Sequence, residues 1–314
     1  MNIIPFLSRR RRKRRYSKTV DSLFLTTPDL HKKHAHDKNK YLEFGLSQMQ
    51  GWRSSMEDTH CFLMKFDPHA WSEWSYFSIF DGHNGTETAK KCAQNFHGYM
   101  LQALNDMLKH DHVEGPVTSS KLDIETFRKV IKQTYFYMDD KLKKTKSQQD
   151  ESGAVAITCL IGPEKIYFIN LGDARAILVS KNGQVLLSTH DHTASDEHEK
   201  ERIEEKDGSI WDGRVEGQLM PTRVFGDFSM NKYLVSPDAE IEEYPRYDSN
   251  YELGFIVLAC DGIWDVMSNE ECANFILERI HNTPNLCQIC DEVIDECLKR
   301  ESSDNMTIYI IKFL

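Results

Sequence analysis

The chain has 314 residues, of which 40% are hydrophobic and 11% aromatic, enough apolar material for one large domain or two small ones. The net charge of the chain is −10. Residues 1–40 contain twelve Lys or Arg and three Asp, so residues 41–314 alone carry a net charge of about −19. An acidic body argues against a nucleic-acid groove and is compatible with cation binding, and no apolar run approaches the ~20 residues of a membrane span.

The first predicted segment is a basic tail over residues 1–40. Arg9–Arg15 are seven consecutive basic residues, whose mutual repulsion favours a solvated, disordered segment. The same block is also typical of a nuclear-import signal, an anionic-membrane patch or a mitochondrial presequence, and the sequence does not choose among them. The eight scattered cysteines indicate a reduced, intracellular chain. We therefore expect a protein of the cytoplasm or the nucleus.

Residues 41–314 are predicted to form one folded domain. Tyr76–Phe80 is a short apolar run bounded by turn residues, which is typical of a buried strand. Apolar residues at three- and four-residue spacing then predict helices at 89–107 and 124–142, the second with Asp123 as its N-cap. Residues 109–122 between them are predicted to be a loop.

After the second helix the apolar period becomes that of strands. Short apolar runs separated by Gly, Pro and Asp predict strands at 154–161, 166–171, 175–179, 185–187, 255–260 and 306–313. Helices are expected near 197–206, after a capping box at Ser268, and at 286–298. This order of elements predicts an α+β fold with sheets stacked between helices.

Four acids lie beside predicted strands: Asp81, Asp173, Asp261 and Asp304. Any one of them could be an ordinary turn residue, but all four occur in Asp-Gly, Gly-Asp or Asp-Asn contexts. If they converge, their repulsion must be offset by bound cations. Oxygen ligands without a His or Cys cluster favour Mg²⁺ or Mn²⁺ over zinc. Two such ions could activate a water for in-line attack on phosphorus.

Six motifs that surround these acids occur in a fixed order: Gly51-Trp52-Arg53 with Glu57-Asp58, Asp81-Gly82-His83-Asn84-Gly85, Gly172-Asp173-Ala174-Arg175, Gly213-Arg214 through Arg223-x-Phe225-Gly226-Asp227, Asp261-Gly262-Ile263-Trp264-Asp265, and Ser303-Asp304-Asn305-Met306-Thr307. The set resembles the metal-dependent protein phosphatase family, the type 2C Ser/Thr phosphatases, over residues 41–314. The resemblance implies a four-layer α-β-β-α sandwich, in which two antiparallel sheets are flanked by helix pairs and the metals lie in a cleft at one end of the sheets.

The resemblance also implies how the metals are held. Asp81 would bridge two Mg²⁺ or Mn²⁺ ions, and the carbonyl of Gly82 would bind one of them. Asp261 and Asp304 would bind the other ion.

Further acids are implied around these two ions. Glu57 and Asp58 would hold metal-bound waters, and Asp173 and Asp265 would join Asp261 around a third, more weakly held ion.

The implied activity is hydrolysis of phosphoserine and phosphothreonine in phosphoprotein substrates by a metal-bridging hydroxide, without a covalent phosphoenzyme. Arg53 would bind the substrate phosphate through its planar guanidinium, and His83 would be the general acid that protonates the departing oxygen. The alternatives are a surface salt bridge for Arg53 and a turn or metal-shell histidine for His83. We expect a monomer.

Some positions depart from the family pattern, and all of them flank the cleft: Asn84, Ala154, Met220-Pro221-Thr222 and the short connection Ser229–Ser236. They concern substrate preference rather than metal binding. The polar segment 191–222 would be a flap that selects substrates or simply a solvated face. Two rival functions remain: a pseudophosphatase that serves as a partner-binding module, and a two-metal nuclease or phosphodiesterase. No metal acid is missing, which disfavours the first, and the negative charge disfavours the second.

Overall fold

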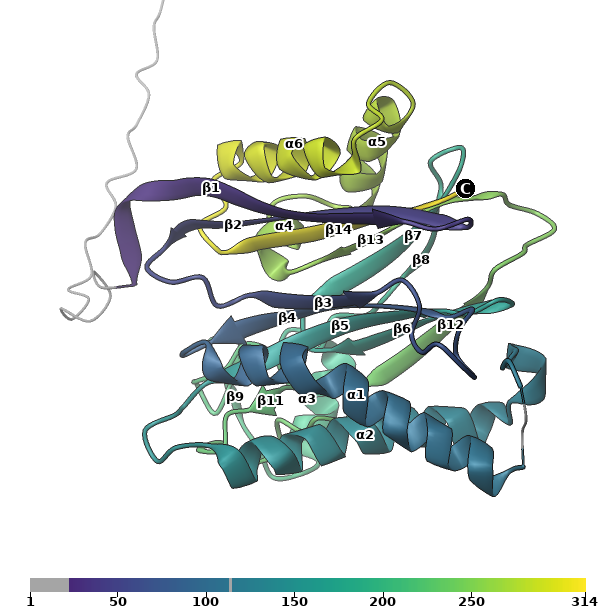
Figure 1. Ribbon diagram of the computed structural model, residues 1–314. Helices are drawn as coiled ribbons and strands as arrows, with labels where there is room; N and C mark the ends of the chain where they lie inside the picture. The colour runs from purple at the N-terminus through teal and green to yellow at the C-terminus, as the bar shows by residue number, and fades with distance from the viewer. Residues whose placement is uncertain (1–22, 113–114) are drawn as a thin grey trace, which may run out of the picture.

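The computed structural model describes residues 23–112 and 115–314 (Figure 1). Within them, two six-stranded sheets lie face to face, and every strand pair is antiparallel. A helix pair covers the outer face of each sheet, as the four layers of Figure 1 show. The α+β sandwich predicted from the sequence is confirmed.

The first sheet contains the strands on both sides of the predicted domain boundary at residues 40 and 41. Its strands lie in the order β1 (Phe24–Lys38), β2 (Leu42–Arg53), β14 (Met306–Phe313), β13 (Leu253–Ala259), β7 (Arg175–Ser180) and β8 (Val185–Ser188). The sheet therefore joins the first described strand of the chain to the last one.

The second sheet is built mainly from the middle of the chain. Its main path is β12 (Glu240–Pro245), β6 (Lys165–Leu171), β5 (Gly153–Ile161), β4 (Ser75–His83) and β3 (Thr59–Leu63), while β11 (Phe225–Gly226) pairs with β5. A separate hairpin of β9 (Ile210–Trp211) and β10 (Arg214–Val215) lies in the predicted flap.

The helices cover the sheets in pairs. The second sheet packs on α1 (Glu87–His110) and α2 (Ile124–Thr145), and the first on α5 (Asn269–Ile280) and α6 (Leu286–Lys299). The Asp123 carboxylate accepts a hydrogen bond from the Thr126 amide, and Ser268 forms a capping box with Glu271. Both predicted caps are confirmed. The described residues also form three short helices: η1 (Ser119–Lys121), α3 (Glu197–Glu204) and α4 (Asp261–Trp264).

The alternation of side chains along β4 determines where its last residues point. Phe77 and Ile79 lie in the core between the sheets, whereas Tyr76 and Phe80 pack against the helices. Because the side-chain period of a strand is two, Asp81 lies on the same face as Phe77 and Ile79. The strand thus brings a carboxylate to the edge of the apolar layer between the sheets.

Several sequence-based expectations are corrected here. The predicted disordered tail over residues 1–40 is wrong for residues 24–38, which form β1 and pair with β2. β1 is mostly exposed and polar, so it has no apolar period that the sequence could reveal. β4 continues to His83 because its pairing with β5 extends that far, beyond the predicted end at Phe80. The short strands β9–β12 were not predicted.

Two further expectations concern the basic block and membrane spans. The basic block Arg9–Arg15 lies outside the described residues. In the part of the chain that the structure describes, none of the helices is both long and apolar enough to cross a bilayer.

Candidate metal centre

The acids that the sequence placed beside strands converge at one end of the two sheets. The pKa of Asp81 lies well above its usual range because the carboxyl is buried and because Asp261 and Asp58 are nearby charges, with Asp304 and Asp173 contributing less. The pKa of Asp261 is raised well above its ordinary value by burial and then by the charges of Asp173, Asp304, Asp265 and Asp58. These strand-end acids therefore lie within electrostatic reach of one another.

Asp58 has one carboxylate oxygen paired and one without a partner. The Thr307 hydroxyl donates a hydrogen bond of 2.6 Å to Oδ2, whereas Oδ1 is buried and has no hydrogen-bond partner. Burial is the main reason that the pKa of Asp58 rises to about 6. An orphaned buried oxygen is costly unless a ligand satisfies it. A bound cation, or a water on it, would satisfy this atom.

Cys260 lies within 4.8 Å of ligand atoms of Asp58 and Asp81. Its sulfur accepts a hydrogen bond of 3.1 Å from the Thr307 amide, and burial raises the pKa of the thiol well above its usual value. The neutral thiol is a poor metal ligand, because metals bind the thiolate. The available donors are therefore carboxylate and carbonyl oxygens, which fit Mg²⁺ or Mn²⁺.

A second group of acids lies beside Asp261. The pKa of Asp173 is raised to about 7 by burial and by the charge of Asp191. Burial also raises the pKa of Asp265, with Asp304 and Asp191 as the nearby charges. Asp173, Asp261 and Asp265 are thus brought together as predicted.

Asp191 belongs to this group although the sequence analysis did not name it. The Arg175 guanidinium holds its carboxylate with two hydrogen bonds, of 2.9 Å from Nε and 2.6 Å from Nη2. Asp191 lies in a polar segment with no adjacent apolar strand, so the signal that identified the other acids is missing there. A weaker signal was available in the two histidines on either side of it, His190 and His192.

Glu57 and Gly82 fix the turn that carries Asp81. The Glu57 carboxylate accepts hydrogen bonds from the Ser55 hydroxyl, at 2.7 Å, and from the Gly85 amide, at 3.1 Å. A Cβ atom at Gly82 would lie only 2.6 Å from the backbone oxygen of Glu57, so no larger residue fits at this position. The close approach of the two segments depends on this glycine.

Arg53 lies at the end of β2 and reaches into the acid cluster. Its Nη2 donates a hydrogen bond to the Asp304 carboxylate, and its Nε is buried without a partner. Burial lowers the pKa of Arg53, but Asp304, Asp261 and Asp81 outweigh that effect and raise it. The guanidinium therefore stays charged and keeps a donor for another oxyanion.

His83 pairs with Asp227. Asp227 belongs to one of the six motifs, but the sequence assigned it no role. The distance from Nε2 to Oδ2 is 2.6 Å, and Asp227 is only 4% exposed. Asp227 adopts a φ of +46°, a region that Asp tolerates better than most residues. The Lys232 ammonium donates hydrogen bonds to the carbonyls of Val224 and Gly226. These bonds fix the short connection Ser229–Ser236, to which Lys232 belongs.

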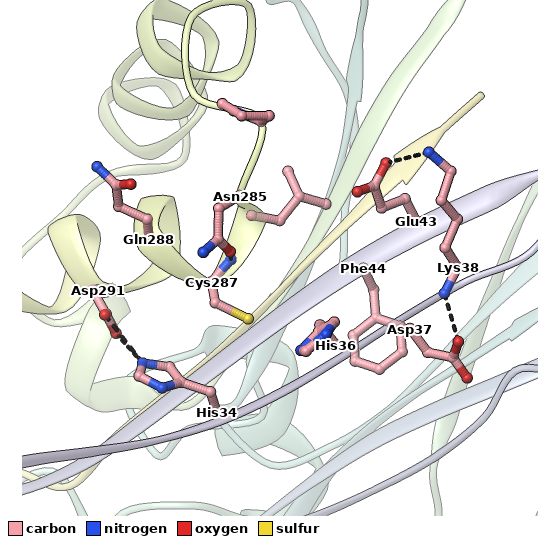
Figure 2. Close-up of a pocket in the computed structure, with 12 residues that line it drawn as sticks. His34, His36, Asp37, Lys38, Glu43, Phe44, Asn285, Cys287, Gln288 and Asp291 are labelled. Atoms are coloured by element: carbon pink, nitrogen blue, oxygen red, sulfur yellow. Dashed lines mark hydrogen bonds and ion pairs between the residues drawn. The ribbon is translucent and has the colours of Figure 1, made fainter.

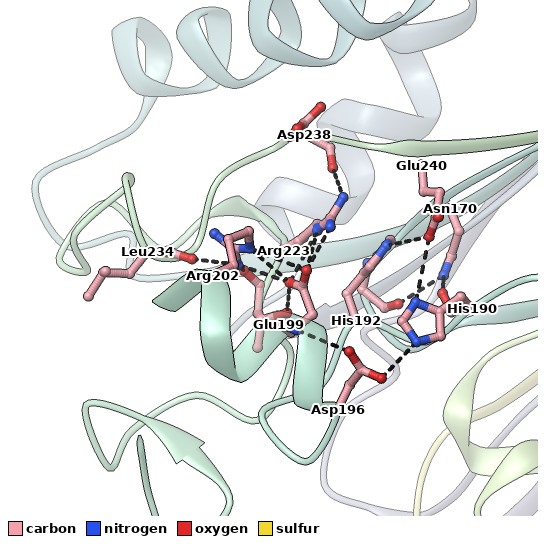
Figure 3. A network of polar contacts seen from close by, with 12 residues as sticks. Asn170, His190, His192, Asp196, Glu199, Arg202, Arg223, Leu234, Asp238 and Glu240 are labelled. Atoms are coloured by element: carbon pink, nitrogen blue, oxygen red, sulfur yellow. Dashed lines mark hydrogen bonds and ion pairs between the residues drawn. The ribbon is translucent and has the colours of Figure 1, made fainter. Parts of the chain in front are cut away.

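A polar network connects the flap helix α3 to neighbouring segments (Figure 3). The Glu199 carboxylate on α3 accepts hydrogen bonds from Arg202 and Arg223, and together they lower its pKa although burial opposes this. This network joins the flap helix to the residues that lead into β11.

His190, His192 and Glu240 lie close together in the same region. However, the His192 Nδ1 atom accepts a hydrogen bond from the Gly172 amide at 3.1 Å, so Nε2 carries the proton and donates to Glu240. A histidine that binds metal through Nε2 normally donates through Nδ1. The three residues therefore form a structural network and not a metal site.

Comparison with known proteins gives concordant matches. Residues 42–306 match the family model described as Protein phosphatase 2C. Human protein phosphatase 1B is 36% identical over 301 residues, which cover 92% of this chain and 61% of the human protein. Bovine protein phosphatase 1A is 36% identical over 301 residues that cover 92% of this chain and 75% of the bovine protein. The chain thus spans about 61% of the length of the human relative.

Two solved structures share the fold. The crystal structure of serine-threonine phosphatase 2C from Toxoplasma gondii superposes with a TM-score of 0.74 at 20% identity, over 90% of this chain and 99% of that one. A C. elegans sex determining protein superposes with a TM-score of 0.73 at 22% identity, over 88% of this chain and 66% of that one.

Proposed function

The chain belongs to the protein phosphatase 2C family, and from this premise we propose that it is a Mg²⁺- or Mn²⁺-dependent protein Ser/Thr phosphatase. The observation that carries the proposal is the convergence of buried carboxylates at one end of the sandwich, with Asp58 Oδ1 left without a partner. Buried acids with raised pKa values and no sufficient basic partners call for divalent cations.

The proposed metal ligands belong to the acid cluster. Asp81, the carbonyl of Gly82, Asp261 and Asp304 would hold the two ions. The chemistry that bound ions would supply there is activation of a water for in-line attack on phosphorus.

The outer acids have supporting roles in this proposal. Glu57 and Asp58 would hold waters on the ions. Asp173 and Asp265 would hold a third, more weakly bound ion together with Asp261. The charge of Asp191 acts on both Asp173 and Asp265.

The remaining chemistry belongs to two side chains of the cleft. Arg53 would bind the substrate phosphate, and its orphaned Nε supports this role because it is a donor without an acceptor. His83 would donate a proton from its imidazole to the departing serine or threonine oxygen. Asp227 would hold the ring in position through its contact with Nε2.

We test this function by following phosphate release from phosphoserine and phosphothreonine peptides in Mn²⁺ or Mg²⁺. We expect turnover that stops when EDTA removes the ions, and little turnover of a phosphotyrosine peptide. A rate retained in EDTA would eliminate the metal-dependent mechanism. No release in either metal would favour the alternative, a pseudophosphatase that binds partners, and cleavage of nucleic acid would favour a nuclease.

The proposal extends to partners and boundaries. We infer that phosphoproteins are the substrates, that the enzyme acts as a monomer, and that the catalytic domain spans residues 41–314 with β1 added to its edge. A nuclear-import role for Arg9–Arg15 stays a prediction, to be checked by the location of an Arg9–Arg15→Ala variant. Substrate selection by residues 191–222 is likewise a proposal.

A further inference from the structure

A recess of about 420 Å³ lies at the opposite end of the sandwich from the acids. β4 begins beside this recess at Ser75 and ends in the metal centre at His83. Eight strand steps of about 3.4 Å separate the two positions by roughly 27 Å. The residues that line the recess come from the β1–β2 turn, the β3–β4 connection and the segment after β12: Asn39, Lys40, Tyr41, Leu42, Met64, Lys65, Ser72, Glu73, Ser75 and Arg246.

Arg246 is the arginine that lines this recess. Its guanidinium carbon lies 5.2 Å from the centre of the Tyr41 ring and 6.0 Å from that of Phe313. Nη1 donates to the Gly162 carbonyl at 3.0 Å, and within the described residues Nε and Nη2 make no hydrogen bond and no carboxylate lies within 4.0 Å. Glu73 is the acid of the recess whose charge acts on Arg246, but it forms no ion pair with it, so that two guanidinium donors remain available to a ligand.

The other charges of the recess reinforce this basic character. The Lys40 ammonium lies 4.3 Å from the centre of the Tyr41 ring, and Lys65 lines the same hollow. Glu73 is the acid among the lining residues, so three cations face one anion. This is the reverse of the charge on residues 41–314 as a whole.

We propose that this recess binds the phosphate group of a small soluble molecule, at a site separate from the metal centre. The Arg246 fork supplies the directional donors that match phosphate oxygens, and Lys40 and Lys65 supply the remaining charge. A recess, rather than a projecting basic surface, favours a small molecule over a membrane. The inference does not depend on the proposed phosphatase activity.

A larger hollow elsewhere does not support a ligand in the same way. The cavity of about 740 Å³ between β1 and α6, shown in Figure 2, contains His34, which is already paired with Asp291 at 2.8 Å. Lys38 likewise pairs with Glu43 at 3.1 Å. Charges that neutralise one another indicate no class of ligand.

The test is a titration of the full-length, Mg²⁺-loaded protein with inorganic phosphate, followed by NMR of the Arg246 Nε–Hε group at constant ionic strength. This signal reports the recess separately from any phosphate at the metal centre. We expect a saturable shift that chloride does not reproduce. The double variant Lys40→Gln/Lys65→Gln should weaken the apparent affinity at least fivefold, and Glu73→Gln should strengthen it. Lys132→Gln, at a half-buried lysine of α2 that pairs with Asp238, is the control.

Two results would overturn the inference. One is the absence of a saturable shift in the protein, or a shift that the double variant leaves unchanged. The other is flotation of the protein with anionic vesicles that requires Lys40 and Lys65 while phosphate fails to compete, because the recess would then recognise a membrane surface. The lysine variants lie on exposed positions, so that loss of folding does not confound the measurement.

Discussion

Asp81 and Asp261 are the residues on which the proposed chemistry depends most directly. Both carboxyls have pKa values far above their ordinary range because burial and neighbouring carboxylates oppose ionisation. Such an arrangement destabilises the metal-free protein and is retained only if a ligand compensates for it. Neutralising these acids is therefore expected to lower the activity and to raise the stability of the metal-free protein.

We expect Asp81→Asn and Asp261→Asn each to abolish metal-dependent phosphate release while leaving the fold intact. In EDTA near pH 7.5 their Tm should equal or exceed that of the parent, because an amide removes like-charge repulsion. Phosphate release and thermal melting measure the two effects. Asp140→Asn, on the exposed face of α2 and paired with Lys144, is the control that should retain normal turnover. Normal kinetics in either cleft variant would mean that the ligands are misassigned.

The contact of 2.6 Å between His83 and Asp227 makes a second prediction at this scale. Asp227→Asn keeps the shape of the side chain but removes its charge. We expect kcat to fall by about 10–100-fold with KM nearly unchanged, since a misplaced general acid loses part of its contribution of about 10²–10⁴.

A double-mutant cycle separates this role from a general structural one. Asp227→Asn should have little further effect in a His83→Ala background, because residues that act as a unit are not additive. Equal losses in both backgrounds would show that Asp227 acts independently of His83.

At the level of elements, the position of α6 depends on the absence of a side chain in β2. A Cβ atom at Gly45 would lie 2.5 Å from the Cys287 nitrogen and from the Leu286 carbonyl carbon, at the start of the helix. Both atoms belong to the backbone, so relief requires the helix to move away from the sheet. The first sheet and its helix layer are thus in contact through their main chains.

Gly45→Ala is therefore expected to lower the free energy of unfolding by about 1–3 kcal/mol, as overpacking does elsewhere. Gly98→Ala is the matched control, because Gly98 lies in α1 and, apart from its chain neighbours and the backbone of its own helix, no atom lies within 4 Å of the added methyl group. That substitution should be neutral or stabilising by about 0.5–1 kcal/mol. Chemical denaturation of both variants measures the difference, and a stable Gly45→Ala protein would contradict the packing argument.

For the whole molecule, the acid cluster couples stability to pH and to metal. In the metal-free protein the pKa values of Asp58 and Asp173 are raised to about 6 and about 7, mainly by burial. Carboxyls with raised pKa values bind more protons in the folded state than in the unfolded state. Their contribution to stability is therefore present below the unfolded pKa and is lost as pH rises through the folded values.

We thus expect the Tm in EDTA to fall between pH 5 and pH 8. The corresponding loss in the free energy of unfolding is on the order of a few kcal/mol. Mn²⁺ should raise the Tm more at pH 8 than at pH 5, because protons compete with the ion for the same oxygens. The slope in EDTA should be smaller in Asp81→Asn. Melting curves over this range measure it, and a Tm that rose with pH in EDTA in both proteins would refute the linkage.

Much of the fold could be predicted from the sequence, because its elements carry local signals. The apolar periods around α2 and α6, the cap at Asp123 and the capping box at Ser268 are properties of neighbouring residues. The strand-end context likewise identified Asp81 and Asp261. These features depend on side-chain spacing and backbone preference, which the sequence contains directly.

The tertiary structure decided what depends on residues far apart in the chain. β1 exists because β2 offers it a hydrogen-bonding edge, and Asp191 joins the cluster because Arg175 holds it there. Asp227 faces His83 from 144 positions away. None of these contacts leaves a local pattern, since each is stabilised by a partner that only the folded chain brings within reach.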